Sequence, residues 1–297
     1  MRAVQLGISP LTWTNDDMPE LGGHIPLETC LSEMAQSGFT GTELGTKYPR
    51  DPQILLPLLK QYGLVLASGW FSGNLMLFSA QEEIAAMQGH IKLLKAAGCT
   101  VMVYGEVSNS VHGNINMPLS HRVILSEDEW KVYAEKLTVV ADHLVNEHGI
   151  KLSYHHHVGT ICETEDDINL LMNLTGDAVY LTLDTGHMTY GGGEPVSMIK
   201  RWGHRIGHMH FKDIRSDILQ ATRAVDKSFL NAVLDGVFTV PGNGDIGYND
   251  IFSALKAQHY KGWLVVEAEQ DPAKADPLTF AKIAYETIIG YVDKYDL

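Results

Sequence analysis

The chain has 297 residues, of which 45% are hydrophobic, and its formal net charge is −14. This length and apolar content predict one large domain or two ordinary ones and exclude a largely disordered chain. An acidic balance disfavours binding to nucleic acid or to anionic membranes, because both need a basic surface. The amino-terminal segment does not have the pattern of a signal peptide, and no apolar run has the length of a membrane span. With three cysteines and no CxxC pair, the sequence predicts a cytoplasmic protein without a disulfide framework.

Short apolar runs alternate with longer helical patterns along the whole chain. The apolar runs predict strands at Val4–Ile8, Thr42–Leu44, Val65–Ser68, Thr100–Val103, Lys151–His155, Val179–Leu183, Ile206–His210 and Trp263–Glu267. The segments between them predict helices at Pro26–Ser37, Pro52–Tyr62, Ser79–Ala97, Ser126–His148, Thr164–Leu174, Pro195–Trp202, Tyr248–His259 and Pro277–Tyr291. Glycines follow several of these helical patterns, as expected where a left-handed residue ends a helix.

Strand–helix units in series predict parallel strands that are joined by right-handed crossovers. Eight such units close into a (β/α)8 TIM barrel. No linker divides the chain, so we expect a single domain over residues 1–297. The long connections Phe71–Leu77, Tyr104–Leu125 and Lys212–Gly247 all follow strands, and they therefore lie at the face where such barrels place their chemistry. An open doubly wound sheet is the alternative, which the lack of GxGxxG after the first strand disfavours.

Acidic and histidine residues lie at the carboxyl ends of the predicted strands. They are Glu43, His155, Asp184, His210 and Glu267. In a closed barrel these positions converge on one axis, and carboxylates with imidazoles are usual ligands of divalent metals. Any one of them alone is explained as a polar residue at the barrel rim. Their coincidence favours a metal site, because buried charges need partners.

Four segments point to a known superfamily: LTLDTGHMTYGG, IGHMHFKDIR, VPGNGDIGYNDIF and WLVVEAEQD. Together they resemble the xylose-isomerase-like sugar isomerases and epimerases, which are TIM barrels. In that superfamily a Glu, an Asp, a His and a Glu from strands five to eight hold the metal. The resemblance implies that Asp184, His210 and Glu267 are metal ligands. It also implies that His187 and Arg215 contact the substrate.

Strand five departs from the superfamily pattern. The register that begins at Gly149 places His155 where the superfamily has its first glutamate. A neutral imidazole can bind a metal, so we expect His155 to be the fourth ligand. His157, which shares a strand face with His155, and Glu163, from the following loop, are the alternatives.

A closer resemblance covers nearly the whole chain. The segments GISPLTWTNDDMPELGG, TELGTKYPRDP, YHHHVGT, LDTGH and HFKDIR look like the myo-inosose-2 dehydratase family of inositol catabolism. This implies a hydro-lyase that converts 2-keto-myo-inositol (scyllo-inosose), a small keto-cyclitol, to a trihydroxycyclohexane-1,2-dione with manganese or cobalt. A glutathione requirement is also associated with the family. The sequence leaves the oligomeric state open, with a homo-oligomer as one possibility.

The chemistry of such a reaction is compatible with the strand-end residues. Eliminating water beside a ketone needs a base for the α proton, an electrophile for the enolate and an acid for the departing hydroxyl. A divalent metal is the expected electrophile. Glu267, Glu43 and His187 are candidate acid–base groups, and Lys212 is a further donor that also contacts substrate. The identity of the base stays open.

Two residues after the first strand are further candidates for substrate contact. Trp13 is placed to pack against a ring face, although packing in the core explains it equally well. Asn15 is expected in a hydroxyl-binding loop, although asparagine also favours turns.

Three other functions are weighed against the dehydratase. A ketose isomerase or epimerase shares the enolisation step, but its typical pair of metal-flanking glutamates is broken here by His155. A DNA-repair endonuclease needs a basic groove, which the charge of −14 disfavours. A non-catalytic sugar-binding barrel does not need Asp184, His210 and Glu267 together.

Overall fold

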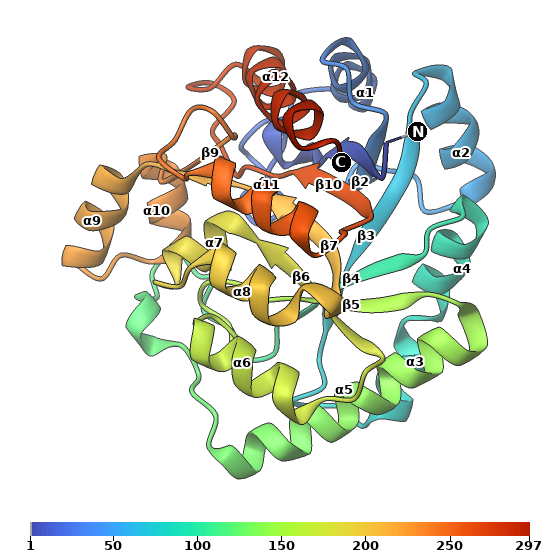
Figure 1. The fold of residues 1–297 in the computed structure, drawn as a ribbon, viewed down its shortest axis with the longest axis vertical. Coiled ribbons are helices and arrows are strands. Elements are labelled where there is room, and N and C mark those ends of the chain that lie inside the picture. Colours follow the sequence, from blue (N-terminus) through green and yellow to red (C-terminus); the bar gives the residue numbers. More distant parts are fainter. Residues whose placement is uncertain (1) are drawn as a thin grey trace.

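The structure, a computed structural model, describes residues 2–297 and contains the predicted barrel. Within these residues, eight parallel strands close in the order β1-β10-β7-β6-β5-β4-β3-β2 (Figure 1). The strands are β1 Val4–Ile8, β2 Gly41–Leu44, β3 Val65–Gly73, β4 Val101–Glu106, β5 Lys151–His155, β6 Val179–Asp184, β7 Ile206–Phe211 and β10 Gly262–Val266. Each contains all or nearly all of a predicted strand, so the (β/α)8 prediction is confirmed.

Helices surround the barrel on its outside (Figure 1). Those that join successive strands are α1 Leu27–Gln36, α2 Pro52–Gln61, α3 Ala80–Ala86, α4 Gln88–Ala97, α5 Glu127–His148, α6 Glu165–Leu174, α8 Pro195–Trp202 and α11 Tyr248–Ala257, and α12 Pro277–Tyr295 follows the last strand. The helix predicted over Ser79–Ala97 is in fact two, because Met87 ends α3 and precedes α4. Capping fixes the long helix α5: Ser126 and Glu129 form a capping box, and Gly149 ends it with a φ of 68°. Among the described helices, none is long and apolar enough to cross a membrane.

Short elements inserted after β6 and β7 were not predicted. They are α7 Thr185–Tyr190, α9 Ser216–Ala224, α10 Phe229–Asp235 and the antiparallel pair β8 Asp213–Ile214 with β9 Phe238–Thr239. The helices α9 and α10 lie together at one side of the barrel (Figure 1). Phe229 and Phe238 from these insertions form a second apolar cluster, which also contains Val158 and Tyr190. Phe229 and Phe238 of this cluster pack against the ring of His187, which follows β6.

The strand register brings the predicted site residues to one level. Asp184 at the end of β6 pairs with His210 on β7, and His210 pairs with Val265 on β10. The backbone of Glu267, directly after β10, donates a hydrogen bond to the carbonyl of Phe211 at 3.1 Å. Because neighbouring parallel strands end together, three of the expected metal ligands lie side by side.

A buried carboxylate holds two loops against the same end of the barrel. Glu106, the last residue of β4, accepts hydrogen bonds from the backbone N–H groups of Leu75 and Ser108, each at 2.9 Å. These two residues belong to the loops that follow β3 and β4. Burial raises the pKa of Glu106 to about 7, against the opposing effect of these hydrogen bonds.

The raised pKa of Glu106 predicts a pH dependence of stability. Between its ordinary value of 4.5 and about 7, the folded chain keeps a proton that the unfolded chain releases. The contribution of Glu106 to the free energy of unfolding is therefore expected to fall as the pH rises through this window, by roughly 3 kcal/mol. Urea unfolding of the wild type and of Glu106→Gln across this window checks it. The slope should be shallower in the variant, and identical slopes would assign the effect to other groups.

Candidate metal centre and active site

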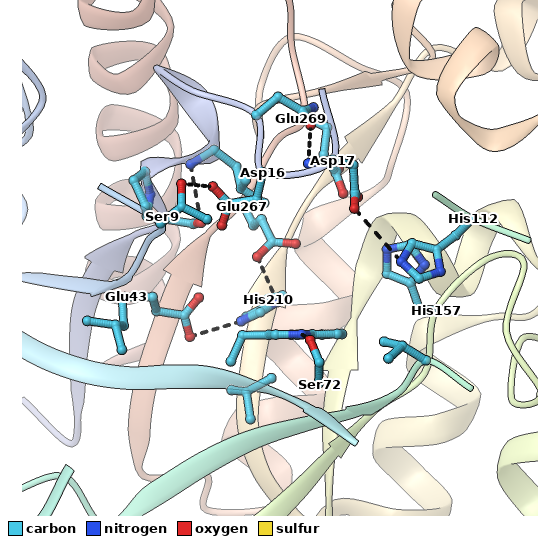
Figure 2. Close-up of a pocket in the computed structure, with 18 of the residues that line it drawn as sticks. Ser9, Asp16, Asp17, Glu43, Ser72, His112, His157, His210, Glu267 and Glu269 are labelled. Atoms are coloured by element: carbon cyan, nitrogen blue, oxygen red, sulfur yellow. Dashed lines mark hydrogen bonds and ion pairs between the residues drawn. The ribbon is translucent and has the colours of Figure 1, made fainter. Parts of the chain in front are cut away.

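A cavity of about 380 Å³ opens at the carboxyl end of the barrel. Its inner part is lined by Glu43, His210 and Glu267, which converge from β2, β7 and the end of β10 (Figure 2). Loop residues such as Asp16, Asp17 and His112 line it as well. A deep pocket with acidic and imidazole groups at its base is a typical site for a small polar ligand.

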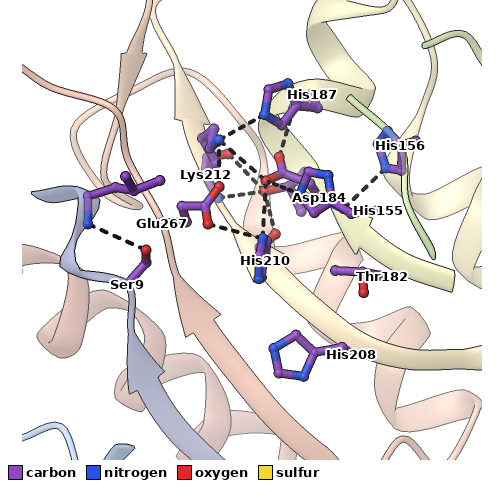
Figure 3. Close-up of polar contacts among 12 residues, drawn as sticks. Ser9, His155, His156, Thr182, Asp184, His187, His208, His210, Lys212 and Glu267 are labelled. Carbon is purple, nitrogen blue, oxygen red and sulfur yellow. Dashed lines mark hydrogen bonds and ion pairs between the residues drawn. The ribbon is translucent and has the colours of Figure 1, made fainter. Parts of the chain in front are cut away.

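The four expected metal ligands come together beside this cavity (Figure 3). Oδ2 of Asp184 lies 3.6 Å from Nε2 of His155 and 3.8 Å from Nδ1 of His210. Nδ1 of His210 lies 3.4 Å from Oε2 of Glu267. All four side chains are buried. Strands from distant parts of the sequence thus bring two imidazoles and two carboxylates close together.

The polar atoms at this point lack partners and suit a cation. Within the described chain, Asp184 Oδ2, His210 Nδ1 and both ring nitrogens of His155 are buried without a hydrogen bond. Such atoms are costly unless a partner satisfies them. Burial lowers the pKa of His155, which keeps its imidazole neutral, as metal binding requires. The donor types therefore fit a divalent metal. Among the described residues, ligand atoms of His155, Asp184, His187 and Glu267 lie close enough together to hold one ion, whereas His210 groups with Glu43 and His208.

Lys212 brings a buried positive charge to the same carboxylates. Its Nζ donates to Oε1 of Glu267 at 2.9 Å and lies 2.7 Å from Oε2 of Glu269. It also donates to Nε2 of His187 at 2.9 Å. Burial opposes the charge, but Asp184, Glu267 and Glu269 raise the pKa of Lys212. The ammonium group is therefore held charged between the candidate metal ligands and His187.

Glu269 was not singled out as a site residue from the sequence, although it follows Glu267 by two positions. It is buried and lines the cavity. Burial raises the pKa of Glu269 to about 7, with Lys212 acting in the opposite direction. The i, i+2 spacing in WLVVEAEQD is the signal that indicates it, because alternate residues of an extended segment share a face.

Glu43 contacts the ligand set through His210. One oxygen of its carboxylate, Oε1, accepts hydrogen bonds from Ser68, from Nε2 of His208 at 2.9 Å and from Nε2 of His210 at 3.1 Å. A proton on Nε2 of His210 leaves Nδ1 facing Asp184 and the candidate metal position. This is the carboxylate–histidine arrangement that orients ligands in metal sites. His208 was missed in the sequence, where the spacing HxH on one strand indicates it.

We expect Glu43→Gln to weaken metal affinity by about tenfold to a hundredfold, because it removes the charge that orients His210. Titration of the metal-free protein with Mn²⁺ by calorimetry measures this. Glu83→Gln is the matched control, since Glu83 is equally buried but does not line the cavity. Equal affinities in wild type and Glu43→Gln would contradict the role of this contact.

The expected substrate contact Asn15 lines the cavity, but its side chain has a local partner. Oδ1 of Asn15 accepts hydrogen bonds from the backbone of Asp17 at 2.9 Å and of Met18 at 2.8 Å. This is an Asx turn. Asn15 therefore shapes the loop that brings Asp16 and Asp17 to the cavity rim.

Four expected substrate contacts do not line the cavity. His187 and Lys212 are fully buried beside the candidate metal ligands, whereas Trp13 and Arg215 have partners elsewhere. Trp13 is fully buried in the hydrophobic core, and its Nε1 donates to Glu33 at 2.6 Å. Arg215 donates to the carbonyl of Gly236 at 2.6 Å and to Oδ1 of Asn243 at 2.7 Å. Arg215 therefore stabilises the β8–β9 pair. It follows β8, so it no longer stands at the end of the barrel strand β7.

The two alternative fourth ligands have separate positions. Oε2 of Glu163 accepts from the backbone of Gly159 at 2.7 Å, and its Oε1 lies 3.7 Å from Nε of Arg122. It lines a different surface cleft. His157 lines the main cavity and packs against His187 with ring centroids 3.9 Å apart. Of the three candidates, only His155 faces Asp184 directly.

The barrel and its carboxylate–histidine site define a class of protein. A family model described as "Xylose isomerase-like TIM barrel" matches residues 31–283. Among solved structures, L-ribulose 3-epimerase superposes with a TM-score of 0.70 at 17% identity, covering 98% of this chain and 95% of that one. The probable 3-DHS dehydratase AsbF of Bacillus anthracis superposes with a TM-score of 0.70 at 16% identity, covering 96% and 98%. At these identities the likeness shows the fold alone.

Curated relatives narrow the class. The "Rhizopine catabolism protein MocC" of Rhizobium meliloti is 47% identical over 97% of this chain and 88% of its own length. The "Inosose dehydratase" of Clostridium perfringens is 44% identical over 94% of both chains, and that of Geobacillus thermodenitrificans is 44% identical over 96% of both. The chain therefore belongs to the inosose dehydratase family of the xylose isomerase-like TIM barrels. It is an enzyme of this kind.

Proposed function

We propose that this enzyme removes water from 2-keto-myo-inositol (scyllo-inosose) to give a trihydroxycyclohexane-1,2-dione. The observation that carries the proposal is the buried group of His155, Asp184, His210 and Glu267 beside a cavity of about 380 Å³. The inosose dehydratases at 42–44% identity support the choice of substrate. A cyclitol ring fits a pocket of this size, which is near the lower end for small-molecule sites.

We assign metal binding to these four residues, with manganese or cobalt as the metal. A divalent metal bound there supplies an electrophile for the carbonyl and neighbouring hydroxyl oxygens. Lys212 and the buried carboxylates surround the same position, so the reacting end of the substrate is held in a water-poor, charged environment. Glu43 contacts His210 and also lines the cavity, so it stays a candidate acid or base besides its contact with the ligand set.

The reaction breaks a C–H bond next to the ketone and the C–O bond of the hydroxyl on the following carbon. One water leaves, and the resulting enol becomes the dione. Lys212, held charged, is the proton donor that we assign to the departing hydroxyl. Glu267 and His187 both contact Nζ of Lys212, so they can accept the α proton or return one to the lysine.

We expect His187→Ala to lower turnover by roughly tenfold to a hundredfold while metal content is retained. His187 is fully buried, and burial lowers its pKa well below the ordinary value, so it acts as a neutral group beside Lys212. Metal analysis and steady-state rates on the same preparation measure both quantities. An unchanged rate would remove His187 from the reaction.

The decisive assay follows the conjugated product. The metal-loaded protein is incubated with 2-keto-myo-inositol, and the absorbance of the dione and its conjugated enol is recorded together with the product mass. Dehydration predicts growth of the absorbance and a product lighter than the substrate by one water. Asp184→Asn is the matched control for a contaminating activity. A product of unchanged mass would instead indicate the alternative, a metal-dependent ketose isomerase or epimerase, which the dehydratase relatives do not favour.

The remaining features of the proposal have two sources. Glutathione as a further requirement is implied by the family resemblance, whereas a cytoplasmic location and one folding domain over residues 1–297 are the expectations from the sequence pattern. Rates with and without added glutathione test the first, and cell fractionation tests the second. Cooperative unfolding tests the third. Sedimentation of the purified chain distinguishes a monomer from a homo-oligomer.

A further inference from the structure

Trp70 brings a large apolar ring to the main cavity. Among the described residues that line this cavity, it is the only Trp, Tyr or Phe. It lies on β3 and is only partly buried. Polar side chains line the cavity too, namely Asn15, Asp16, Asp17, Thr46, Arg50 and Ser72. The cavity therefore combines one broad apolar surface with many hydrogen-bonding groups.

The indole is held in a fixed orientation. Its Nε1 donates to Oγ of Ser72 at 2.9 Å. Its six-membered ring lies over Gly105 of β4, where a Cβ atom would collide with it. Its ring centroid is 5.2 Å from that of His155, in an edge-to-face arrangement. Glycine at position 105 thus leaves space for the indole of Trp70, which packs beside the candidate metal ligand His155.

The proposed substrate has a shape that matches such a surface. In the chair of scyllo-inosose every hydroxyl is equatorial, so both faces of the ring present only axial C–H bonds. Such a face packs well on an aromatic ring, while the hydroxyls point outward to polar groups. An axial hydroxyl on the face next to the indole would lose its hydrogen bonds to water without gaining a partner.

We propose that Trp70 is the platform for one face of the cyclitol ring and selects substrates whose hydroxyls are all equatorial. This specificity role rests on the proposed function. Trp70 touches the substrate ring but takes no part in proton transfer or in metal binding. Its loss should therefore change which cyclitols bind and leave metal content unchanged.

Two unreactive probes test the selection directly. Scyllo-inositol has six equatorial hydroxyls, whereas myo-inositol has one axial hydroxyl. Their inhibition constants are measured against 2-keto-myo-inositol turnover by the metal-loaded wild type, Trp70→Leu and Trp70→Phe. Trp202→Leu is the matched control, because Trp202 lies on α8 with its Nε1 bonded to Asn169 and does not line the cavity.

We expect the wild type and Trp202→Leu to prefer scyllo-inositol by about tenfold. Trp70→Leu should bring the two constants within about twofold, and Trp70→Phe should keep most of the preference. Metal content should be equal in all four proteins. If Trp70→Leu kept the full preference for scyllo-inositol, or if the wild type showed no preference, the proposed role of Trp70 as a platform would be wrong. Absence of turnover by the wild type would instead overturn the proposed function, and direct calorimetry with the two inositols would then still test Trp70.

Discussion

Asp184→Asn, His210→Ala and Glu267→Gln are each expected to lose bound metal and to lower turnover by more than about a hundredfold. Each removes one donor from a buried group whose atoms lie 3.4 to 3.8 Å apart. In a site of this kind the remaining donors cannot compensate, because the barrel strands hold them in place. Metal content by elemental analysis and the rate of dione formation measure the two effects.

The fold should survive these substitutions, since all three residues lie at the carboxyl end of the barrel rather than in its apolar interior. Thermal unfolding of the metal-free proteins checks this, with Glu83→Gln as a buried carboxylate control. Full metal content and wild-type turnover in all three variants would place the active site elsewhere.

The barrel could be predicted because its signals are local and repeated. Each strand is a short apolar run, and capping residues such as Ser126 and Gly149 mark the helix ends. The insertions α9, α10 and β8–β9 could not be predicted in the same way. They are short, and their apolar residues Phe229 and Phe238 are buried in a cluster that also contains the distant residues Met18, Val158 and Tyr190. Their stability comes from tertiary packing, which periodicity does not report.

The site was predictable where a strand ends and unpredictable beyond it. Asp184, His210 and Lys212 all project from strand ends, so their positions follow from the register. Arg215 stands only three residues after Lys212, but the chain has already turned into β8, and its guanidinium binds the hairpin instead. Trp13 shows another limit of the sequence. An aromatic residue that follows a barrel strand has the same sequence pattern whether its side chain lines the cavity or packs in the core.

His155→Ala is expected to lose the metal, whereas His156→Gln is expected to retain it. Neighbouring residues of a strand face opposite sides. Nε2 of His155 lies 3.6 Å from Oδ2 of Asp184, while Nε2 of His156 accepts a hydrogen bond from the backbone N–H of Asp184 at 3.2 Å. Glutamine at 156 keeps an acceptor for that N–H, so it is the matched control. Metal retained by His155→Ala would rule out His155 as a ligand, and His157, which also lines the cavity, would be tested next.

His155→Glu separates metal binding from catalysis. It restores the carboxylate that the xylose-isomerase-like superfamily has at this position, so we expect the metal to bind. The added negative charge makes the metal a weaker Lewis acid and raises the pKa of any bound water or hydroxyl. Dehydration should therefore be slower than in the wild type at equal metal content. An equal or faster rate would show that efficient dehydration does not depend on a histidine at position 155.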